Sequence, residues 1–546
     1  MEKGEILIVG AGPVGLTMAS ELIRHGVQCR IIDQALYHAG DSRAVGIHAR
    51  TLEIFEDMNI LLPILKKGIK VNGINIYSSK KHLLRTEYKG LDTPHSFIID
   101  LPQSQTELIL IHQLENLGLK VQRNTELNNM ELKKDSVDVM FKCEKRGLVP
   151  DTFTYVIGCD GAHSTCRHLL KLPFPGSEYP SHWVVFDTKL DMPYDPQEMH
   201  IFLHIEGVTA LFPLPNNQMR VICEVPHKEE EEPLPTLSFD FVKNILHQRL
   251  SNEVQISEPC DLSSFVIHHR QVTQYRKGHV FLAGDAAHIH SPAGGQGMNT
   301  GIHDAYNLAW KLALVHKGIA SKSILETYEQ ERLPIAESVL RLTDKMTKMA
   351  TTKSSVLTLV RDMSMSLAGN FEKLGHQLPK RLSQLYIKYE PNAIIVKETH
   401  HHHPTHIHIG QRAPDHTVKQ GEEEKHLFQL FKGIHHTLLI FSGKKPTVEE
   451  LKNAEELSSS LKDFPHIQSY LVYRNDENFL SSPAQVKALL DREPSIHSHY
   501  GITKATALLV RPDGYIGYIQ EPLDIKKFHQ YLNQIFIEGK YHDPLC

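Results

Sequence analysis

The sequence predicts an α/β protein with a doubly wound nucleotide-binding domain, an inserted mixed-sheet domain and a small α/β domain at the C-terminal end. Three observations predict this fold class. A strand, a glycine turn and a helix open the chain, apolar strands of the same kind return late in the sequence, and the last part has strands and helical segments of its own. The chain has 546 residues, more than one hydrophobic core usually organises, so several domains are expected.

The first elements alternate strand, helix and strand. Residues 5–9 form a short apolar run typical of a buried parallel strand, residues 14–25 have apolar side chains at helical spacing, and residues 28–32 form a second apolar run. The same domain is expected to continue in a helix at 106–117, strands at 120–122, 154–157 and 280–283, and a helix at 304–315. This order is the opening of a doubly wound sheet.

The remaining elements fall into two further groups. Residues 73–88 and 182–225 alternate apolar and polar side chains, which predicts half-exposed antiparallel strands in a sheet inserted into the first domain. The tail has apolar strands at 437–441, 469–472 and 507–510. We therefore expect a nucleotide-binding domain of residues 1–72, 98–180 and 267–350, an inserted substrate domain of residues 73–97, 181–266 and 351–395, and a C-terminal domain of residues 405–546.

Composition narrows the class of protein. The formal net charge of −5 gives no basic surface of the kind that binds nucleic acid, so no nucleic acid partner is expected. No apolar run has the length of a membrane span, and the first residues lack the features of a secretory signal, so we expect a cytoplasmic protein with no membrane partner. The seven cysteines form no CxxC pair, which predicts reduced thiols. Histidines at 400–403, 406 and 408 are interpreted as part of a linker, and no functional metal site is expected.

A glycine fingerprint follows the first strand directly. Gly10 permits a tight turn, Gly12 lets backbone N–H groups approach a pyrophosphate, and Gly15 allows close packing of the helix. Asp33 stands at the end of the second strand, where a carboxylate can accept a hydrogen bond from a ribose hydroxyl. These residues predict dinucleotide binding but do not separate FAD from NAD.

Two later segments separate these cofactors. Residues 158–164 read GCDGAHS and are followed by Arg167, and residues 284–288 read GDAAH. They resemble the DG and GD motifs of the single-component FAD-dependent aromatic hydroxylases, the group of para-hydroxybenzoate hydroxylase and phenol hydroxylase. The resemblance covers residues 1–350 and is most specific at residues 281–313. The residues agree with it, because the glycine-rich run 294–299 supplies free backbone N–H groups ahead of a helix.

The resemblance implies a role in FAD binding for a further set of residues. Asp285 would bind the ribityl chain, Pro292 would lie beside the flavin, and the pyrimidine edge of the flavin would contact Gly297, Met298 and Asn299.

Three more residues match the family's pattern. Arg43 matches an arginine near the adenine nucleotide, Gln103 matches a glutamine that binds the cofactor chain, and Asp160 would serve both FAD and the nicotinamide nucleotide. Asp33 replaces the usual glutamate of the family with a shorter acid that is still expected to reach the ribose.

The resemblance implies an activity as well. A nicotinamide nucleotide, NADPH or NADH, would bind transiently and reduce FAD, O2 would react to form a flavin 4a-hydroperoxide, and the distal oxygen would pass to a phenolic or polyketide-like aromatic ring. A single dinucleotide fingerprint agrees with transient binding of the nicotinamide nucleotide. The candidates for a catalytic base are His48, Tyr179, His200, His204 and His288, none of which the sequence singles out.

The tail from about residue 410 resembles the thioredoxin-like C-terminal domain of the phenol hydroxylase branch, most clearly in LLVRPDG at 508–514. Without CxxC this domain is not expected to exchange disulfides, and a structural or homodimer-supporting role is expected. Two alternatives stay open: an FAD-dependent reductase or Baeyer–Villiger-type oxygenase, and a non-catalytic flavin-binding protein.

Overall fold

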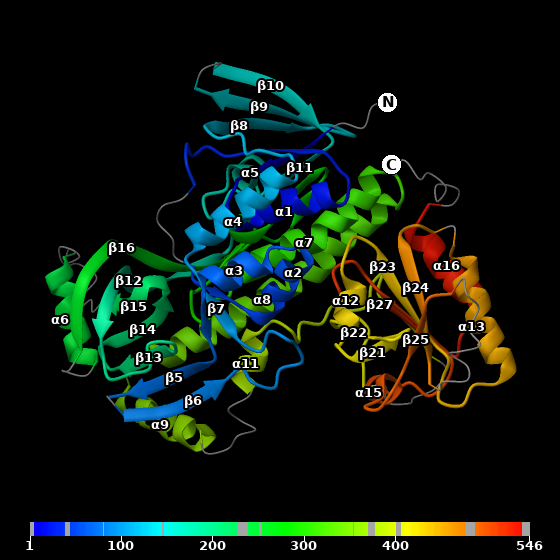
Figure 1. Cartoon of the computed structure of the whole chain (residues 1–546). Helices are drawn as coiled ribbons and strands as arrows, with labels where there is room; N and C mark the ends of the chain where they lie inside the picture. The colour runs from blue at the N-terminus through cyan, green and yellow to red at the C-terminus, as the bar shows by residue number, and fades with distance from the viewer. Residues whose placement is uncertain are drawn as a thin grey trace. The chain divides into compact units, whose positions relative to one another are not determined.

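The computed structural model describes residues 5–38, 44–79, 81–144, 147–225, 238–250, 254–352, 354–369, 377–399, 406–462, 464–474 and 486–537 (Figure 1). These residues form two compact units. The first contains the described residues up to Ser20 together with Cys29–Ala305 and Ala336–Leu385. The second contains Glu21–Gln28, Tyr306–Ile335 and the described residues from Tyr386 onward. No helix within these ranges is long and apolar enough to cross a bilayer.

The nucleotide-binding sheet of the first unit has five strands in the order β17-β18-β11-β1-β2. Strand β1 (Ile6–Val9) pairs in parallel with β2 (Cys29–Ile32) on one side and with β11 (Tyr155–Gly158) on the other. Strand β18 (Val280–Leu282) continues the parallel pairing beyond β11. All four residues of β1 are buried, as expected for a parallel strand covered on both faces. The predicted doubly wound sheet is therefore confirmed.

The helices of this domain begin close to their predicted positions, with one difference. Helices α1 (Pro13–Arg24) and α4 (Gln103–Asn116) begin one and three residues before the predicted ranges 14–25 and 106–117, and each ends one residue before its predicted end. Helix α7 (Gly297–His316) begins before the predicted residue 304, because buried Asn299 and Thr300 in its first turns break the apolar pattern. Residues 120–122 form only an isolated bridge between Gln122 and Ile32, not a strand.

Smaller elements complete the described part of this domain. A three-stranded sheet contains β3 (Gly46–Ile47), β7 (Ile98–Asp100) and β4 (Ile69–Val71), and a second contains β10 (Gly147–Phe153), β9 (Val137–Cys143) and β8 (Thr125–Leu132). The other elements are α2 (Ala49–Asp57), α3 (Leu61–Lys67), α5 (Thr165–Leu169), β17 (Arg276–Lys277) and the short helix η2 (Gly284–Ala286). Helix α8 (Glu326–Ala350) is divided between the units, with residues 326–335 in the second unit and residues 336–350 in the first.

The inserted sheet has eight strands in the order β19-β16-β12-β15-β14-β13-β5-β6. In sequence order they are β5 (Gly73–Ser78), β6 (Lys81–Glu87), β12 (Gly176–Asp191), β13 (Met199–His204), β14 (Gly207–Leu214), β15 (Gln218–Val225), β16 (Gln255–Gln271) and β19 (His288–Ile289). Neighbouring strands are antiparallel except β13 and β5. Helices α6 (Phe239–Arg249), α9 (Ser355–Gly369) and α11 (Gln377–Leu382) belong to the same unit.

Strands β13, β14 and β15 of the inserted sheet are mostly buried, contrary to the prediction of half-exposed strands from the alternating residues. One face packs in a cluster with Leu211 and Val221, and the other packs in a cluster with Trp183 and Ile222. His200, a polar residue of the alternating pattern, is 1% exposed. The alternation of polar and apolar residues does not predict exposure here, because polar side chains such as His200 form hydrogen bonds inside the protein.

The second unit contains an eight-stranded sheet in the order β20-β27-β26-β23-β24-β25-β21-β22. Its strands are β20 (Val396–Thr399), β21 (Thr417–Gln420), β22 (Glu423–His426), β23 (His436–Phe441), β24 (Ile467–Tyr473), β25 (Ala488–Leu490), β26 (Thr506–Val510) and β27 (Ile516–Glu521), and its helices are α12 (Leu427–Phe431), α13 (Val448–Ser460), α15 (Ile496–Tyr500) and α16 (Ile525–Ile535). Parallel β23 and β24 with antiparallel β26 and β27 form the central part expected of a thioredoxin-like domain.

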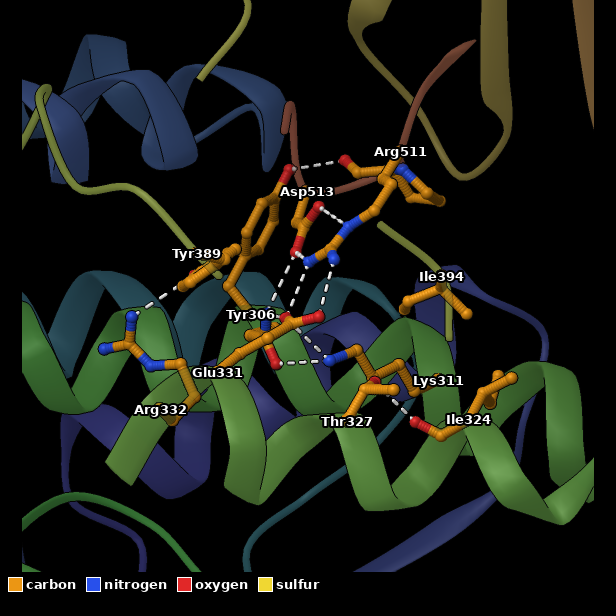
Figure 2. Close-up of polar contacts among 12 residues, drawn as sticks. Tyr306, Lys311, Ile324, Thr327, Glu331, Arg332, Tyr389, Ile394, Arg511 and Asp513 are labelled. Atoms are coloured by element: carbon orange, nitrogen blue, oxygen red, sulfur yellow. Dashed lines mark hydrogen bonds and ion pairs between the residues drawn. The ribbon is translucent and has the colours of Figure 1, made fainter. Parts of the chain in front are cut away.

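A buried charged cluster lies inside the second unit (Figure 2). Glu331 of α8 bonds the Nζ of Lys311 at 2.8 Å and the Nη1 of Arg511 at 2.7 Å, and Asp513 also pairs with Arg511. All four side chains are at most 2% exposed. Although burial alone would raise the pKa of Glu331, the charges of Arg511 and Lys311 hold it well below its usual range. The VRPDG turn is therefore held to α7 and α8 by two positive and two negative charges.

Candidate active site

Two of the fingerprint glycines, Gly10 and Gly12, lie in the turn between β1 and α1, and Gly15 lies in the first turn of α1. Gly10 has a φ of +99°, and a Cβ there would collide with the backbone of Cys159. A Cβ at Gly15 would collide with the Gly10 carbonyl oxygen. A Cβ at Gly12, in contrast, would meet no atom within 4 Å. Two glycines thus permit close backbone packing, and the third leaves open space where a ligand can approach the helix N-terminus.

Asp33 lies beside this turn. Its Oδ2 accepts a hydrogen bond from the backbone N–H of Ala11 at 2.7 Å, and its Oδ1 accepts one from Ala35 at 2.8 Å. Arg123, which the sequence did not single out, places its Nη1 3.6 Å from Asp33 Oδ2. The carboxylate therefore holds the glycine turn in place at the carboxyl end of β2.

Of the two residues predicted to contact the cofactor beyond the glycine turn, the structure describes Gln103 but not Arg43. Gln103 begins α4, and its Nε2 donates to Glu107 Oε1 at 2.8 Å. Arg43 lies outside the described residues.

The DG motif forms a loop closed by its own side chains. Asp160 accepts hydrogen bonds from Ser164 Oγ at 2.6 Å and from the backbone N–H of Cys166 at 3.0 Å. Arg167 donates from Nη2 to the Ala162 carbonyl at 2.8 Å and from Nη1 to the Ala286 carbonyl at 3.1 Å. Arg167 therefore joins the DG motif to the GD motif, a contact that their separation in sequence concealed.

The GD motif stands directly after β18. Asp285 lies in η2 and its side chain is exposed. Buried Asp304 accepts from the Gly284 N–H at 3.1 Å and bonds the Nε2 of His288 at 2.8 Å. Since His288 and Asp304 are both fully buried, His288 supports the backbone of the motif and has no exposed edge for a substrate.

The glycine-rich run forms a tight turn before α7. Exposed Pro292 accepts from the Gly295 N–H at 2.9 Å, and Gly294 and Gly295 have φ values of +79° and +63°. Helix α7 begins at Gly297, so its first backbone N–H groups have no partner within the helix. The helix N-terminus offers a partial positive charge and free donors to an electron-rich group.

Asn299 is fully buried and connects this turn to β3. Its Oδ1 accepts from the His48 N–H at 2.9 Å, and its Nδ2 donates to the carbonyls of Gly46 at 2.9 Å and Gly295 at 2.8 Å. The amide of Asn299 thus fixes the shape of the turn from within. Met298 beside it is 9% exposed.

His48 is the one candidate base that contacts this turn among the described residues. Its Nε2 lies 2.8 Å from the Gly294 carbonyl and 3.2 Å from Gln296 Nε2. Burial lowers the pKa of His48 to about 4, although hydrogen bonds to Gly294 and Gly295 oppose this shift. The ring is therefore neutral near pH 7 and donates to the Gly294 carbonyl, which suits support of the turn.

The other candidates lie in the inserted sheet. Tyr179 donates to Asp344, His200 bonds the Asp195 carbonyl at 2.7 Å, and His204 accepts from the Glu206 N–H at 3.2 Å. Burial, and then the bond to Asp344, raise the pKa of Tyr179 above its usual range. None of these contacts prepares a base for proton transfer.

An apolar wall lies beside the glycine turn. A Cβ at Gly294 would come 2.7 Å from Leu382 Cδ2 and 3.6 Å from Met346 Cε. Leu382 of α11 belongs to a buried cluster formed mainly by the inserted sheet, and the partly buried side chains of Met346, Tyr179, Phe212 and Phe265 pack against this cluster. This wall is suited to a flat apolar ligand.

The residues present fit a flavin nucleotide. Open space at Gly12 faces the α1 N-terminus, exposed Asp285 follows the adjoining strand, and the α7 N-terminus lies beside an apolar wall. These features suit a pyrophosphate, a polyol and an electron-accepting ring, respectively. The fold and the site thus define a flavoprotein of the doubly wound class.

Comparison with known proteins identifies the family. Residues 3–343 match the family described as FAD binding domain, and residues 406–538 match the family described as aromatic-ring hydroxylase, C-terminal. The chain belongs to the FAD-dependent aromatic hydroxylases, which confirms the resemblance found in the sequence. It is a flavoprotein monooxygenase with FAD as cofactor, and a nicotinamide nucleotide is the co-substrate typical of this family.

Relatives and solved structures agree with this family. The chain is 30% identical over 529 residues to a flavin-dependent monooxygenase of Mycobacteroides abscessus, covering 94% of this chain and 97% of the relative. It is 34% identical over 390 residues to an uncharacterised aromatic compound monooxygenase of Bacillus subtilis, covering 71% and 77%. The anhydrotetracycline hydroxylase OxyS of Streptomyces rimosus superposes with a TM-score of 0.75 at 27% identity, covering 98% of this chain and 99% of that structure.

Proposed function

We propose that this enzyme hydroxylates a phenolic or fused-ring, polyketide-like aromatic substrate, with O2 as oxidant and NADPH or NADH as electron donor. The observation that carries the proposal is the apolar wall, which reaches the glycine turn at Leu382 and Met346 and against which half-buried aromatic side chains pack. The names of two relatives support it, since one acts on aromatic compounds and the other on anhydrotetracycline.

We also propose which residues hold the cofactor. The pyrophosphate lies over Gly10, Gly12 and Gly15, and the ribose of the adenine nucleotide lies at Asp33. The ribityl chain contacts Asp285, and Pro292 lies beside the flavin. The remaining contacts, proposed from the family's pattern, are Arg43, Gln103, Asp160, Gly297, Met298 and Asn299.

The chain's own residues orient the reactants and exclude water. Bound FAD supplies the redox chemistry and the activation of oxygen. Asn299 and His48 hold the turn before α7, and the first N–H groups of α7 would stabilise negative charge on the pyrimidine part of a bound flavin. The apolar wall places an aromatic ring beside the turn and keeps water away from it.

The proposal is tested by measuring NADPH and NADH oxidation with a panel of phenols and fused-ring phenols. At least one substrate should accelerate oxidation and appear hydroxylated in near-equal amount. Acceleration only by a non-aromatic ketone that becomes an ester would replace the hydroxylase with a Baeyer–Villiger-type oxygenase. No acceleration by any compound, with FAD that no nicotinamide nucleotide reduces, would leave a flavin-binding protein.

A further inference from the structure

The carboxyl group of Asp100 is buried without a partner at the edge of the apolar wall. Asp100 ends strand β7, is 0% exposed, and neither of its side-chain oxygens has a hydrogen-bond partner in the described ranges. Buried polar groups of proteins are nearly always hydrogen-bonded, and an unpartnered carboxyl is costly to keep. A carboxyl buried under these conditions calls for a partner other than the described residues.

Asp100 lies close to the glycine turn of the flavin site. It pairs with Gly46 across β7 and β3, and a Cβ at Gly46 would come 3.5 Å from Asp100 Oδ1. The carbonyl of the same Gly46 accepts from Asn299 Nδ2. One residue therefore separates the carboxyl from the turn where the flavin is proposed to bind.

Two more polar groups interact electrostatically with this carboxyl. The hydroxyl of Tyr88 is buried and has no hydrogen-bond partner within the described part of the chain, and the charge of Asp100 acts on it. The guanidinium of Arg220 also acts on Asp100, but it gives Nε and Nη2 to Asp187, each at 2.8 Å. Burial, only partly opposed by Arg220, raises the pKa of Asp100 well above its usual range. The shift favours the protonated carboxyl, which can both donate and accept a hydrogen bond.

These groups share the apolar wall with the proposed substrate site. Tyr88 belongs to the same buried cluster as Ile98, Leu382 and Trp183, against which Phe212 and Met346 pack. Because Asp100 has no exposed surface, contact between its carboxyl and a ligand requires neighbouring side chains to move. Methionine and leucine side chains can rotate to allow this.

We propose that Asp100, assisted by the Tyr88 hydroxyl, is the specificity-determining anchor for a hydroxyl or carbonyl group of the aromatic substrate. A protonated carboxyl can accept a hydrogen bond from the hydroxyl of a phenol. It can also donate a hydrogen bond from its own O–H to the oxygen of a ketone. The inference rests on the proposed function, because it concerns the substrate of the same site.

The test compares Asp100→Leu with Asp100→Asn, which keeps a neutral donor and acceptor of similar shape. For a phenol that stimulates the wild type, Asp100→Leu should raise KM about 10- to 100-fold, and Asp100→Asn should raise it by less than about 5-fold. Titration of the bound flavin's absorption spectrum with the same phenol should show the same order of affinities. Ser20→Ala, which removes another buried and unpartnered oxygen, should leave KM unchanged.

Stability without substrate separates an anchor from a structural residue. As an anchor, Asp100 costs stability in the ligand-free chain, so Asp100→Leu should unfold at the same temperature as the wild type or higher and retain FAD. A lower unfolding temperature with unchanged KM would overturn the proposal and make Asp100 a structural residue. Unchanged KM and stability together would overturn it as well. If no phenol stimulates the wild type, the proposed function itself fails, and this outcome is visible before any variant is compared.

Discussion

At the scale of single residues, Asp285 offers the most direct test of the cofactor site. Its exposed carboxylate follows β18 and is proposed to accept from the ribityl chain. Asp285→Ala should weaken FAD binding by about 1–3 kcal/mol, because a ribityl hydroxyl loses its acceptor. FAD retained through gel filtration and dialysis measures this loss. Asp240→Ala, an exposed aspartate in α6, is the control, and equal FAD retention by the two variants would contradict the role of Asp285.

Single residues also show what the sequence can and cannot predict about the site. Gly10 and Gly15 were predictable because only glycine fits such close backbone packing, and local spacing reveals this requirement. The bonds of Asn299 to His48 and Gly46 were not predictable. They join residues about 250 positions apart, and no local pattern reports a hydrogen bond made after the chain has folded. Asp100 was not singled out either, because the lack of a partner for a buried carboxyl also depends on the folded structure.

At the scale of elements, the attachment of the VRPDG turn to α7 and α8 depends on Glu331 (Figure 2). Glu331→Gln removes the negative charge that Lys311 and Arg511 share and leaves buried positive charge only partly compensated. We expect the free energy of unfolding to fall by about 3–5 kcal/mol. Urea unfolding followed by circular dichroism measures the change.

The matched control lies on the same helix. Glu337 pairs with Arg341 at an exposed position, so Glu337→Gln should cost about 0.5 kcal/mol or less. If Glu331→Gln lowered the free energy of unfolding no more than Glu337→Gln, the buried charged cluster would not hold the VRPDG turn.

The elements themselves were largely predictable where one strong local signal existed. Parallel strands such as β1 and β18 appear as short apolar runs because both faces are covered. The start of α7 was placed too late, since its first turn is built from glycine and buried polar residues. The burial of β13 was misjudged because its polar side chains are satisfied inside the protein.

At the scale of the whole molecule, buried histidines predict loss of stability in acid. Burial lowers the pKa of His25 and His436 to about 3 and that of His48 and His290 to about 4. Below pH 6.5 the unfolded chain binds protons at these sites and the folded chain does not. The free energy of unfolding is therefore unaffected by these histidines above pH 6.5, and it decreases as the pH falls from 6.5 towards 3 to 4.

The loss amounts to roughly 2 kcal/mol for each of these histidines at pH 5. The unfolding temperature, measured by calorimetry between pH 8 and pH 5, should be constant down to about pH 6.5 and then fall steeply. His112 is exposed and not buried, so the variant His112→Gln should show the same dependence of unfolding temperature on pH as the wild type. A constant unfolding temperature down to pH 5 would mean that these side chains are not held neutral.

The central claim is that this FAD-dependent enzyme transfers one atom of O2 to an aromatic ring. The most direct measurement supplies 18O2 together with NADPH or NADH and a stimulating phenol, and analyses the product by mass spectrometry. We predict one 18O atom on a ring carbon as a new hydroxyl, in an amount close to the nicotinamide nucleotide consumed. An 18O atom in an ester, or label found only in hydrogen peroxide with every substrate of the panel, would contradict the claim.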